Sequence, residues 1–314
     1  MVTNEKYFDI QRKIVAHITG DSWQEAPHCT FTYDAEADGL LTELKKLNAS
    51  RPKERKITVN TLVTKMIVEG IKESPELNSH ITYSPKSVSG VIRQFDNIDI
   101  SMPMILPDGR MMTITMVDFD KKNIDEMLDY IDDVRRRMMK TNLAHTMYEV
   151  SLEETLGLVK QGRFINIAQR LKGAFIGKGR IHILHGSERR QYESIPRSER
   201  LTKDDIRQGT VTITNIGSLY RTGKVTSHII NLVKPQVCAF CINAVKTVPT
   251  PVRKADGSVD IENKRILPVT LAIDHRAIDF GMCVPLLEKF DEICANPTVI
   301  YDWVDREYTA AAAE

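Results

Sequence analysis

The chain of 314 residues lacks long apolar runs, a surplus of charge of either sign and a framework of cysteines. No apolar stretch approaches the roughly 20 residues that a helix needs to cross a membrane. The formal net charge of +1 gives no electrostatic reason to expect a nucleic acid or an acidic partner. The N-terminus lacks both the apolar core of a signal peptide and the basic composition of a transit peptide, which predicts a cytoplasmic protein.

The five cysteines are odd in number and scattered, so they do not indicate a set of disulfides. Cys238 and Cys241 form a C-x-x-C pair, but they lie inside the apolar stretch 237–242, which is typical of a buried strand. A second pair, which a zinc site of this type would require, does not accompany them. We therefore expect both to be small core residues, and we expect no metal centre in the chain.

Apolar residues recur at helical spacing in some stretches and at strand spacing in others, which predicts a mixed α/β fold. The length is sufficient for a large core, and we expect one domain over 1–314. Asp38 and Thr58 each precede an apolar helical pattern and are predicted N-caps. Predicted helices cover about 8–20, 38–47, 59–71, 121–140 and 281–295, and predicted strands about 29–36, 97–106, 110–119, 209–216, 236–248 and 266–273.

Residues 141–200 interrupt this pattern and predict an inserted helical segment within the domain. Two helices are expected there, at about 151–161 and 164–175. The second mixes an apolar face with basic side chains. A helix of this composition either packs on its own domain or lies on a membrane surface or a partner, and the sequence leaves these alternatives open.

The strand predicted at 266–273 ends in the sequence Asp274-His275-Arg276-Ala-Ile-Asp279. Ionisable groups at the end of an apolar strand are costly to desolvate unless a pairing or a function uses them. A histidine can accept a proton near neutral pH, and a carboxylate four residues later can help to fix its surroundings. Taken alone, the pattern fits a catalytic base and a solvated strand end equally well.

This motif is the last of several short stretches that follow one another in a recognisable order. They are Arg12-Lys13, Ala-Pro-His at 26–28, Ser-Pro-Glu-Leu-Asn at 74–78, Pro-Asp-Gly at 107–109, Gly-Thr-Val-Thr-Ile-Thr-Asn-Ile-Gly at 209–217, and 274–279. Because these stretches occur in this order, the sequence resembles the catalytic core of the dihydrolipoamide acyltransferase components of 2-oxo acid dehydrogenase complexes. This family shares its fold with chloramphenicol acetyltransferase. The resemblance covers about 8–140 and 200–300, and it implies a two-layer sandwich of a mixed sheet and helices.

The resemblance implies a CoA-dependent acyltransferase that moves an acyl group between coenzyme A and a dihydrolipoamide-like thiol or another small acceptor. His275 is then the general base that takes the proton of the acceptor, a role that suits an imidazole near pH 7. Thr214 stands where the family usually has a serine whose hydroxyl stabilises the oxyanion. Asp279 corresponds to a structural aspartate that pairs with an arginine, and Arg12 occupies the matching Arg-Lys position.

The sequence departs from the family pattern at the residue after Asp279. Phe280 replaces the glycine of the family, and Gly281 stands one position later. If the family's glycine has a positive φ, phenylalanine would be strained there, so we expect a locally different turn. The lipoyl domains, subunit-binding domains and Ala/Pro-rich linkers that precede the family's core are absent from this sequence, so we expect no lipoyl attachment in this chain.

The resemblance also implies a homotrimer with active sites between subunits, in which Thr214 and His275 come from different chains. Trimers of this family can assemble into a cubic core, and other subunits of a dehydrogenase complex are the expected partners. The alternative is a non-catalytic scaffold subunit that keeps the fold. Such relatives tend to lose the histidine, so the presence of both His275 and Asp279 favours the enzyme.

Overall fold

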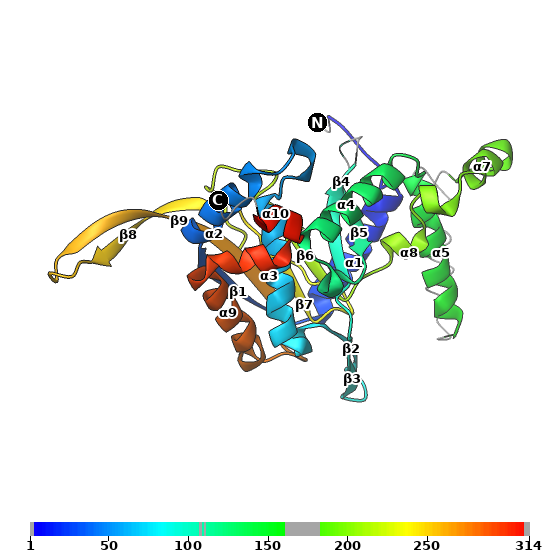
Figure 1. Ribbon diagram of the computed structural model, residues 1–314. Coiled ribbons are helices and arrows are strands. Elements are labelled where there is room, and N and C mark those ends of the chain that lie inside the picture. The colour runs from blue at the N-terminus through cyan, green and yellow to red at the C-terminus, as the bar shows by residue number, and fades with distance from the viewer. Residues whose placement is uncertain (1–2, 107–108, 110, 161–182, 311–314) are drawn as a thin grey trace. The chain divides into compact units, whose positions relative to one another are not determined.

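The computed structural model describes residues 3–106, 109, 111–160 and 183–310 (Figure 1). The helices are α1 Ile10–Glu25, α2 Asp38–Ala49, α3 Val59–Glu73, α4 Ile124–Met138, α5 Leu143–Lys160, α7 Gly186–Glu193, α8 Lys203–Ile206, α9 Phe280–Ala295 and α10 Arg306–Ala310. The strands are β1 His28–Glu36, β2 Ser79–Ser84, β3 Ser89–Gln94, β4 Ile100–Ile105, β5 Met111–Met116, β6 Val211–Asn215, β7 Cys238–Ile242, β8 Lys246–Arg253 and β9 Val259–Asp274. The helix predicted at 164–175 lies outside the described residues.

The chain divides into two compact units. Unit 1 comprises Met1–Asp21, Met104–Thr115 and Ile131–Gln208, and unit 2 comprises Ser22–Pro103, Met116–Tyr130 and Gly209–Glu314. Both contain fully buried apolar side chains, such as Val134 in unit 1 and Phe240 in unit 2. The organisation as one domain over 1–314 stays a prediction.

The larger sheet is mixed, as the sequence predicts. Within the described residues its strand order is β1-β9-β7-β6-β4-β5, and β8 pairs with β9 alone. β9 lies between β1 and β7 and is antiparallel to both, whereas β6 is parallel to β7 and to β4. The register aligns Asp274 with His28 of β1, and Ile273 with Cys238 of β7.

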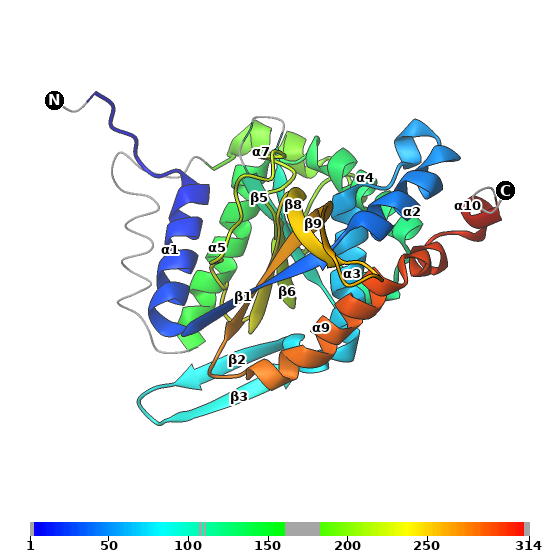
Figure 2. The same ribbon diagram turned by 90° about the vertical axis from the view of Figure 1, so that its left-hand side faces the viewer.

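Different elements cover the two faces of the sheet in unit 2. Helices α3 and α9 run side by side along one face (Figures 1 and 2). They approach closely at Gly70, where a Cβ atom would lie 2.7 Å from the Phe290 ring. On the other face, Ile230 and Leu232 of the segment 217–233 pack on small residues of β7 and β9.

Cys238 and Cys241 are core residues of β7, as predicted, and both are 0% exposed. The Cys238 thiol donates to the carbonyl of Leu77 at 3.1 Å. Burial raises the pKa of the Cys241 thiol to about 11, so the reactive thiolate is scarcely populated at neutral pH.

One of the two predicted helix caps is confirmed and the other is wrong. The hydroxyl of Thr58 accepts the backbone N–H of Thr61 at 3.1 Å, as an N-cap should. Asp38 instead is the first residue of α2, and its carboxylate accepts hydrogen bonds from the backbone N–H and the guanidinium of Arg265. This partner lies 227 residues away in the sequence, which a local pattern cannot indicate.

Near β7 the structure has two strands where the sequence pattern predicts one. The strand predicted at 236–248 is two strands, because β7 ends at Ile242 and β8 begins at Lys246. β8 forms a long hairpin with the first half of β9, which projects from the rest of unit 2 (Figure 1). The hairpin β2–β3 has no counterpart among the predicted strands.

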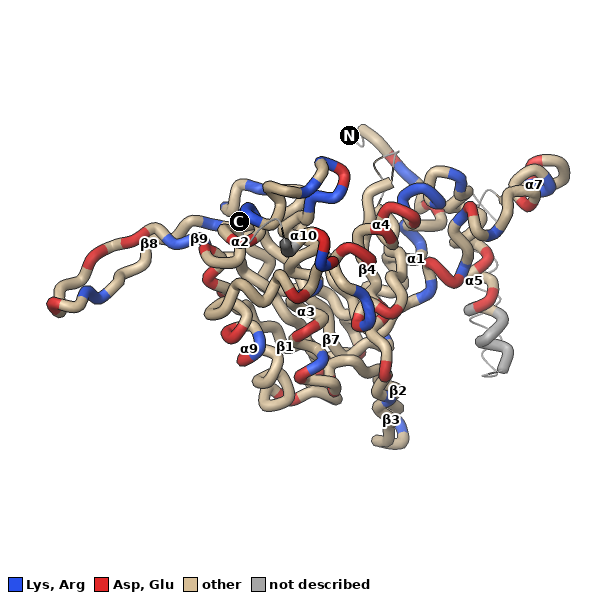
Figure 3. Tube along the Cα trace, viewed as in Figure 1, with Lys and Arg blue, Asp and Glu red and all other residues tan. Residues whose placement is uncertain are grey.

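Polar contacts join helices of unit 1, in addition to its buried apolar side chains. α4 carries both acidic and basic residues (Figure 3), and its Arg137 donates to Asp205 of α8 at 2.7 Å. Tyr192 of α7 places its hydroxyl 3.2 Å from Oγ1 of Thr146 on α5. Among the described residues, no helix has both the length and the apolar character that crossing a bilayer requires. A membrane-surface role of 141–200 stays a prediction.

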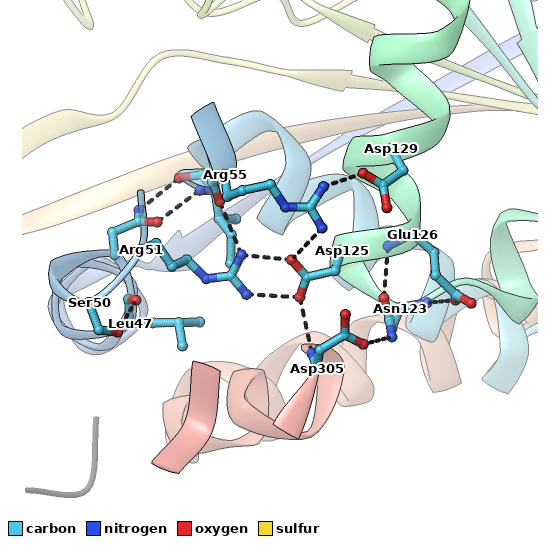
Figure 4. Close-up of polar contacts among 11 residues, drawn as sticks. Leu47, Ser50, Arg51, Arg55, Asn123, Asp125, Glu126, Asp129 and Asp305 are labelled. Carbon is cyan, nitrogen blue, oxygen red and sulfur yellow. Dashed lines mark hydrogen bonds and ion pairs between the residues drawn. The ribbon is translucent and has the colours of Figure 1, made fainter. Parts of the chain in front are cut away.

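A buried ion pair joins the end of α2, the start of α4 and the C-terminal segment of unit 2 (Figure 4). Arg51 donates two hydrogen bonds to Asp125, at 2.8 and 2.9 Å, and both side chains are at most 1% exposed. The backbone N–H of Asp305 donates to the same carboxylate at 3.0 Å, and the Tyr308 ring lies 4.0 Å from the Arg51 guanidinium. Burial alone would raise the pKa of Asp125, but these donors outweigh it and lower the pKa.

We expect Asp125→Ala to lower the free energy of unfolding by about 3–5 kcal/mol, because it leaves the Arg51 guanidinium buried without its partner. Urea unfolding at pH 7 measures this loss. The double substitution Arg51→Met with Asp125→Leu removes both charges and should cost clearly less. Because folding lowers the pKa of Asp125, the stabilisation is present at neutral pH and is lost as the pH falls below about 4. A loss under about 1 kcal/mol in Asp125→Ala, the range of a surface pair, would contradict the role.

Candidate active site

The end of β9 carries the motif that the sequence singled out. The backbone N–H of Asp274 donates to the carbonyl of Val237 at 2.8 Å, and that of His275 donates to the carbonyl of Pro27 at 3.1 Å. Hydrogen bonds to the segments that begin β1 and β7 therefore fix β9 as far as His275. The chain then turns, because the N–H groups of Ala277 and Ile278 both donate back to the carbonyl of Asp274.

Asp274 and Arg276, which the sequence left without roles, form a tight pair around this turn. The Asp274 side chain is 1% exposed and accepts from the guanidinium of Arg276 at 3.0 and 2.6 Å. It also accepts the backbone N–H of Arg276 at 3.0 Å. Hydrogen bonding to the Asp274 carboxylate raises the pKa of Arg276, so the guanidinium keeps its charge.

The imidazole of His275 is half exposed, at 51% of its side-chain surface. Its Nδ1 lies 3.2 Å from the carbonyl oxygen of Ile278 and 3.5 Å from Oδ1 of Asp279. A carbonyl oxygen can only accept, so the geometry favours the tautomer with the proton on Nδ1. The lone pair of Nε2 is then free to accept a proton from a bound acceptor, which is what a general base requires.

Asp279 is placed differently from a buried structural aspartate. Its side chain is 76% exposed, and it stands at the N-cap of α9, where its carboxylate accepts no capping hydrogen bond. Arg12, its predicted partner, belongs to unit 1, and its backbone N–H donates to Asp9 at 2.8 Å. The pairing of Arg12 with Asp279 stays a prediction.

Thr214 lies near the end of β6, opposite Cys241 of β7, and its side chain is partly buried. The motif then turns at Gly217, where the backbone passes close to β7. A Cβ atom at this glycine would lie 2.5 Å from the backbone of Asn243, so only glycine fits. The segment 209–217 thus has the strand and turn that its sequence pattern predicts.

The register places Thr214 and His275 at opposite ends of the sheet. Thr214 is aligned with Cys241 and, across β7, with Thr270 of β9, five positions before His275. Five residues of strand span about 17 Å, and two strand spacings add about 10 Å sideways, so the two residues are roughly 19 Å apart in one chain. A base and an oxyanion donor must both lie within about 3 Å of the reacting groups. One chain therefore cannot bring this pair together.

Phe280, the departure from the family pattern, is accommodated without left-handed backbone. The described non-glycine residues with positive φ are Val88 and Asp118, so Phe280 is not among them. It begins α9, is half exposed, and packs its ring against Phe31 at a centroid distance of 4.9 Å. The ring therefore packs against β1 without requiring a positive φ at this position.

His28, which belongs to another stretch of the family pattern, has a structural role. Its Nδ1 lies 2.7 Å from the carbonyl oxygen of Ala26, and its Nε2 accepts the backbone N–H of Leu232 at 3.0 Å. His80 is partly buried, with Nε2 3.2 Å from the carbonyl oxygen of Gly209, and burial lowers its pKa. In the described part of the chain, no three His, Cys, Asp or Glu side chains form a cluster able to hold a metal.

Solved structures of acyltransferase cores share this fold. A probable dihydrolipoamide acetyltransferase from Listeria monocytogenes superposes with a TM-score of 0.62 at 19% identity, over 93% of this chain and 94% of that one. A truncated catalytic core of the 2-oxoacid dehydrogenase multienzyme complex from Thermoplasma acidophilum gives 0.58 at 18% identity, over 95% and 99%. The predicted fold class, a two-layer sandwich of mixed sheet and helices, is thereby confirmed.

Curated relatives include the dihydrolipoyllysine-residue acetyltransferase components of pyruvate dehydrogenase complexes. That of Rickettsia prowazekii is 25% identical over 291 residues, which are 92% of this chain and 53% of the relative. The mitochondrial component of Schizosaccharomyces pombe is 23% identical over 92% of this chain and 45% of its own length. The chain thus spans about half the length of these relatives.

The family model "2-oxoacid dehydrogenases acyltransferase (catalytic domain)" matches residues 2–150 and 187–301. The interval 151–186 between the two matches lies inside the segment 141–200 that the sequence predicts as an insertion. The two matches together span well over half of the chain and include β6, β9 and the turn with His275. This chain therefore belongs to the family of 2-oxoacid dehydrogenase acyltransferase catalytic domains.

Proposed function

We propose that this protein transfers an acyl group between coenzyme A and a thiol, either dihydrolipoamide or a related small acceptor. The observation that carries the proposal is the half-exposed imidazole of His275, whose Nδ1 is engaged by the Ile278 carbonyl so that Nε2 can act as a base. Membership of the acyltransferase family and the names of the relatives support the substrate class. A cytoplasmic location stays a prediction.

The residues supply the two functions that thioester exchange requires. Nε2 of His275 takes the proton of the acceptor thiol as its sulfur attacks the thioester carbonyl. The hydroxyl of Thr214 donates to the oxyanion of the tetrahedral intermediate. When the intermediate collapses, the C–S bond to coenzyme A breaks, and the imidazolium returns its proton to the departing thiolate. The acceptor leaves acylated, and His275 is neutral again.

The distance between the two residues requires a second copy of the chain. Because about 19 Å of sheet separates them in one chain, we infer that Thr214 of one copy works with His275 of its neighbour. A homotrimer with one such site at each interface satisfies this requirement for every copy. One similar structure is described as the cubic core of the pyruvate dehydrogenase multienzyme complex, which supports further assembly of trimers as part of the proposal.

A structure of similar fold supports the choice of residues. Its description names a serine, a histidine and an asparagine in the catalytic mechanism of the Azotobacter vinelandii dihydrolipoamide acetyltransferase, the latter two spaced by four residues. His275 and Asp279 have the same spacing. Thr214 offers the hydroxyl of a serine, with a methyl group that restricts its rotamers.

We expect His275→Ala to abolish acyl transfer from acetyl-CoA to dihydrolipoamide, because no other group would take the proton of the thiol. Thioester formation, followed at 240 nm, measures the activity, and light scattering checks that assembly is unchanged. His28→Ala makes an unsuitable control since it removes a structural bond, so the exposed His185→Ala serves instead and should keep full activity. Unchanged turnover in His275→Ala would favour the non-catalytic scaffold.

We expect Thr214→Val to lower kcat by on the order of 100-fold, while Thr214→Ser stays within a few-fold of wild type, because serine keeps the donor. The decisive measurement is complementation. Co-assembly of Thr214→Val chains with His275→Ala chains in equal amounts should restore about one quarter of wild-type activity, since each interface draws its two chains independently. Mixtures as inactive as their parents, with mixed oligomers demonstrated by mass spectrometry, would show that the two residues do not share a site between chains.

A further inference from the structure

We infer that the Asp274–Arg276 pair is the positioning device of the catalytic base, the part that the sequence pattern assigned to Asp279. This inference rests on the proposed function of His275. It follows from the contacts that surround the turn after β9, and it concerns residues that the sequence pattern leaves without a role.

The first argument is geometric. Arg276 is bound to Asp274 through its backbone N–H and through two guanidinium nitrogens, all within 2.6–3.0 Å. These bonds close a ring that includes the backbone of His275, the residue between the two partners. Because both of its neighbours are anchored, the backbone angles of His275 are restricted. The direction of its Cα–Cβ bond follows from these angles.

The second argument is burial. The Asp274 carboxylate is 1% exposed, whereas the Asp279 carboxylate is 76% exposed. A buried charge-assisted network holds its geometry against solvent, but an exposed carboxylate at 3.5 Å competes with water for its partner. Asp279 is therefore poorly placed to hold the imidazole by itself.

The third argument is the connection to the rest of unit 2. The guanidinium of Arg276 lies 5.5 Å from the centre of the Tyr83 ring on β2. Asp274 is opposite His28 of β1, and that histidine is itself fixed by Ala26 and Leu232. The pair thus ties the turn to β1 and β2 as well as to its own strand.

The two residues that flank the base carry opposite charges, so removing one or the other should act on it in opposite directions. With Arg276→Gln, the Asp274 carboxylate lacks its counter-charge and favours the imidazolium, so the acid limb of the kcat/KM profile should move to higher pH. With Asp274→Asn, the uncompensated guanidinium disfavours the imidazolium, and the limb should move to lower pH. Each shift should be on the order of half a pH unit. The other groups that face this turn, Glu25, His28, Tyr83 and Asp279, are unchanged in both variants.

The test uses the full-length assembled protein. We expect Arg276→Gln and Asp274→Asn to lower kcat by about 10- to 100-fold, as a misplaced base does, with KM for acetyl-CoA within about twofold of wild type. Arg276→Lys retains the charge but loses the two-nitrogen geometry, so it should keep the wild-type pH profile with a smaller loss of kcat. Arg93→Gln removes an exposed arginine of the β2–β3 hairpin and should change neither quantity.

A second readout is independent of turnover. In protein labelled with ¹³C-histidine, the His275 resonance, assigned by its absence in His275→Ala, should titrate at higher pH in Arg276→Gln and at lower pH in Asp274→Asn. Equal shifts in one direction, or no shift, in folded variants would overturn the inference. If wild type lacks transferase activity but the two shifts oppose each other, the proposed function fails, while the opposed shifts still show that the pair acts on the imidazole of His275. If wild type is active and neither kcat nor the titration responds, the positioning role alone is refuted.

Discussion

β9 hydrogen-bonds to β1 along one edge and to β7 along the other, and this double register sets the position of the candidate base. Along β1 the pairing runs without a break from Glu36 opposite Ile266 to His28 opposite Asp274. Because side chains alternate between faces, a slip by one residue would turn the apolar set of β9 away from α9. Exposing these apolar side chains would cost free energy, so the register of β9 is fixed, and with it the position of the turn that carries His275.

The same register explains why one chain cannot bring together the two residues of the proposed site. β6 reaches β9 only through β7, and Thr214 is level with Thr270, well before the strand ends. No change of rotamer spans such a gap. The sheet therefore presents one half of the proposed site at each end, and an assembly of identical chains is the simplest arrangement that joins unlike ends.

Two ion pairs of unit 2 have the same arrangement around a buried carboxylate. In each, a carboxylate that is about 1% exposed accepts from a guanidinium and from a backbone N–H: Asp125 from Arg51 and Asp305, and Asp274 from Arg276. The backbone donor matters because it fixes the position of the chain segment to which it belongs. The Asp125 pair fixes the C-terminal segment, and the Asp274 pair fixes the turn that follows β9. The buried carboxylates therefore determine the path of the backbone at these two places.

The sequence by itself determined the fold class, most strands and helices, the core position of the paired cysteines and the motif 274–279, which contains His275. These depend on periodicity, local spacing and an ordered resemblance, all of which are readable along the chain. Only the tertiary structure decided that Asp38 binds Arg265, that His80 is partly buried, that Asp274 is paired and Asp279 exposed, and that Thr214 is far from His275. Each of these depends on contacts between distant segments or on which side of a turn a side chain faces, and neighbouring residues alone do not specify either.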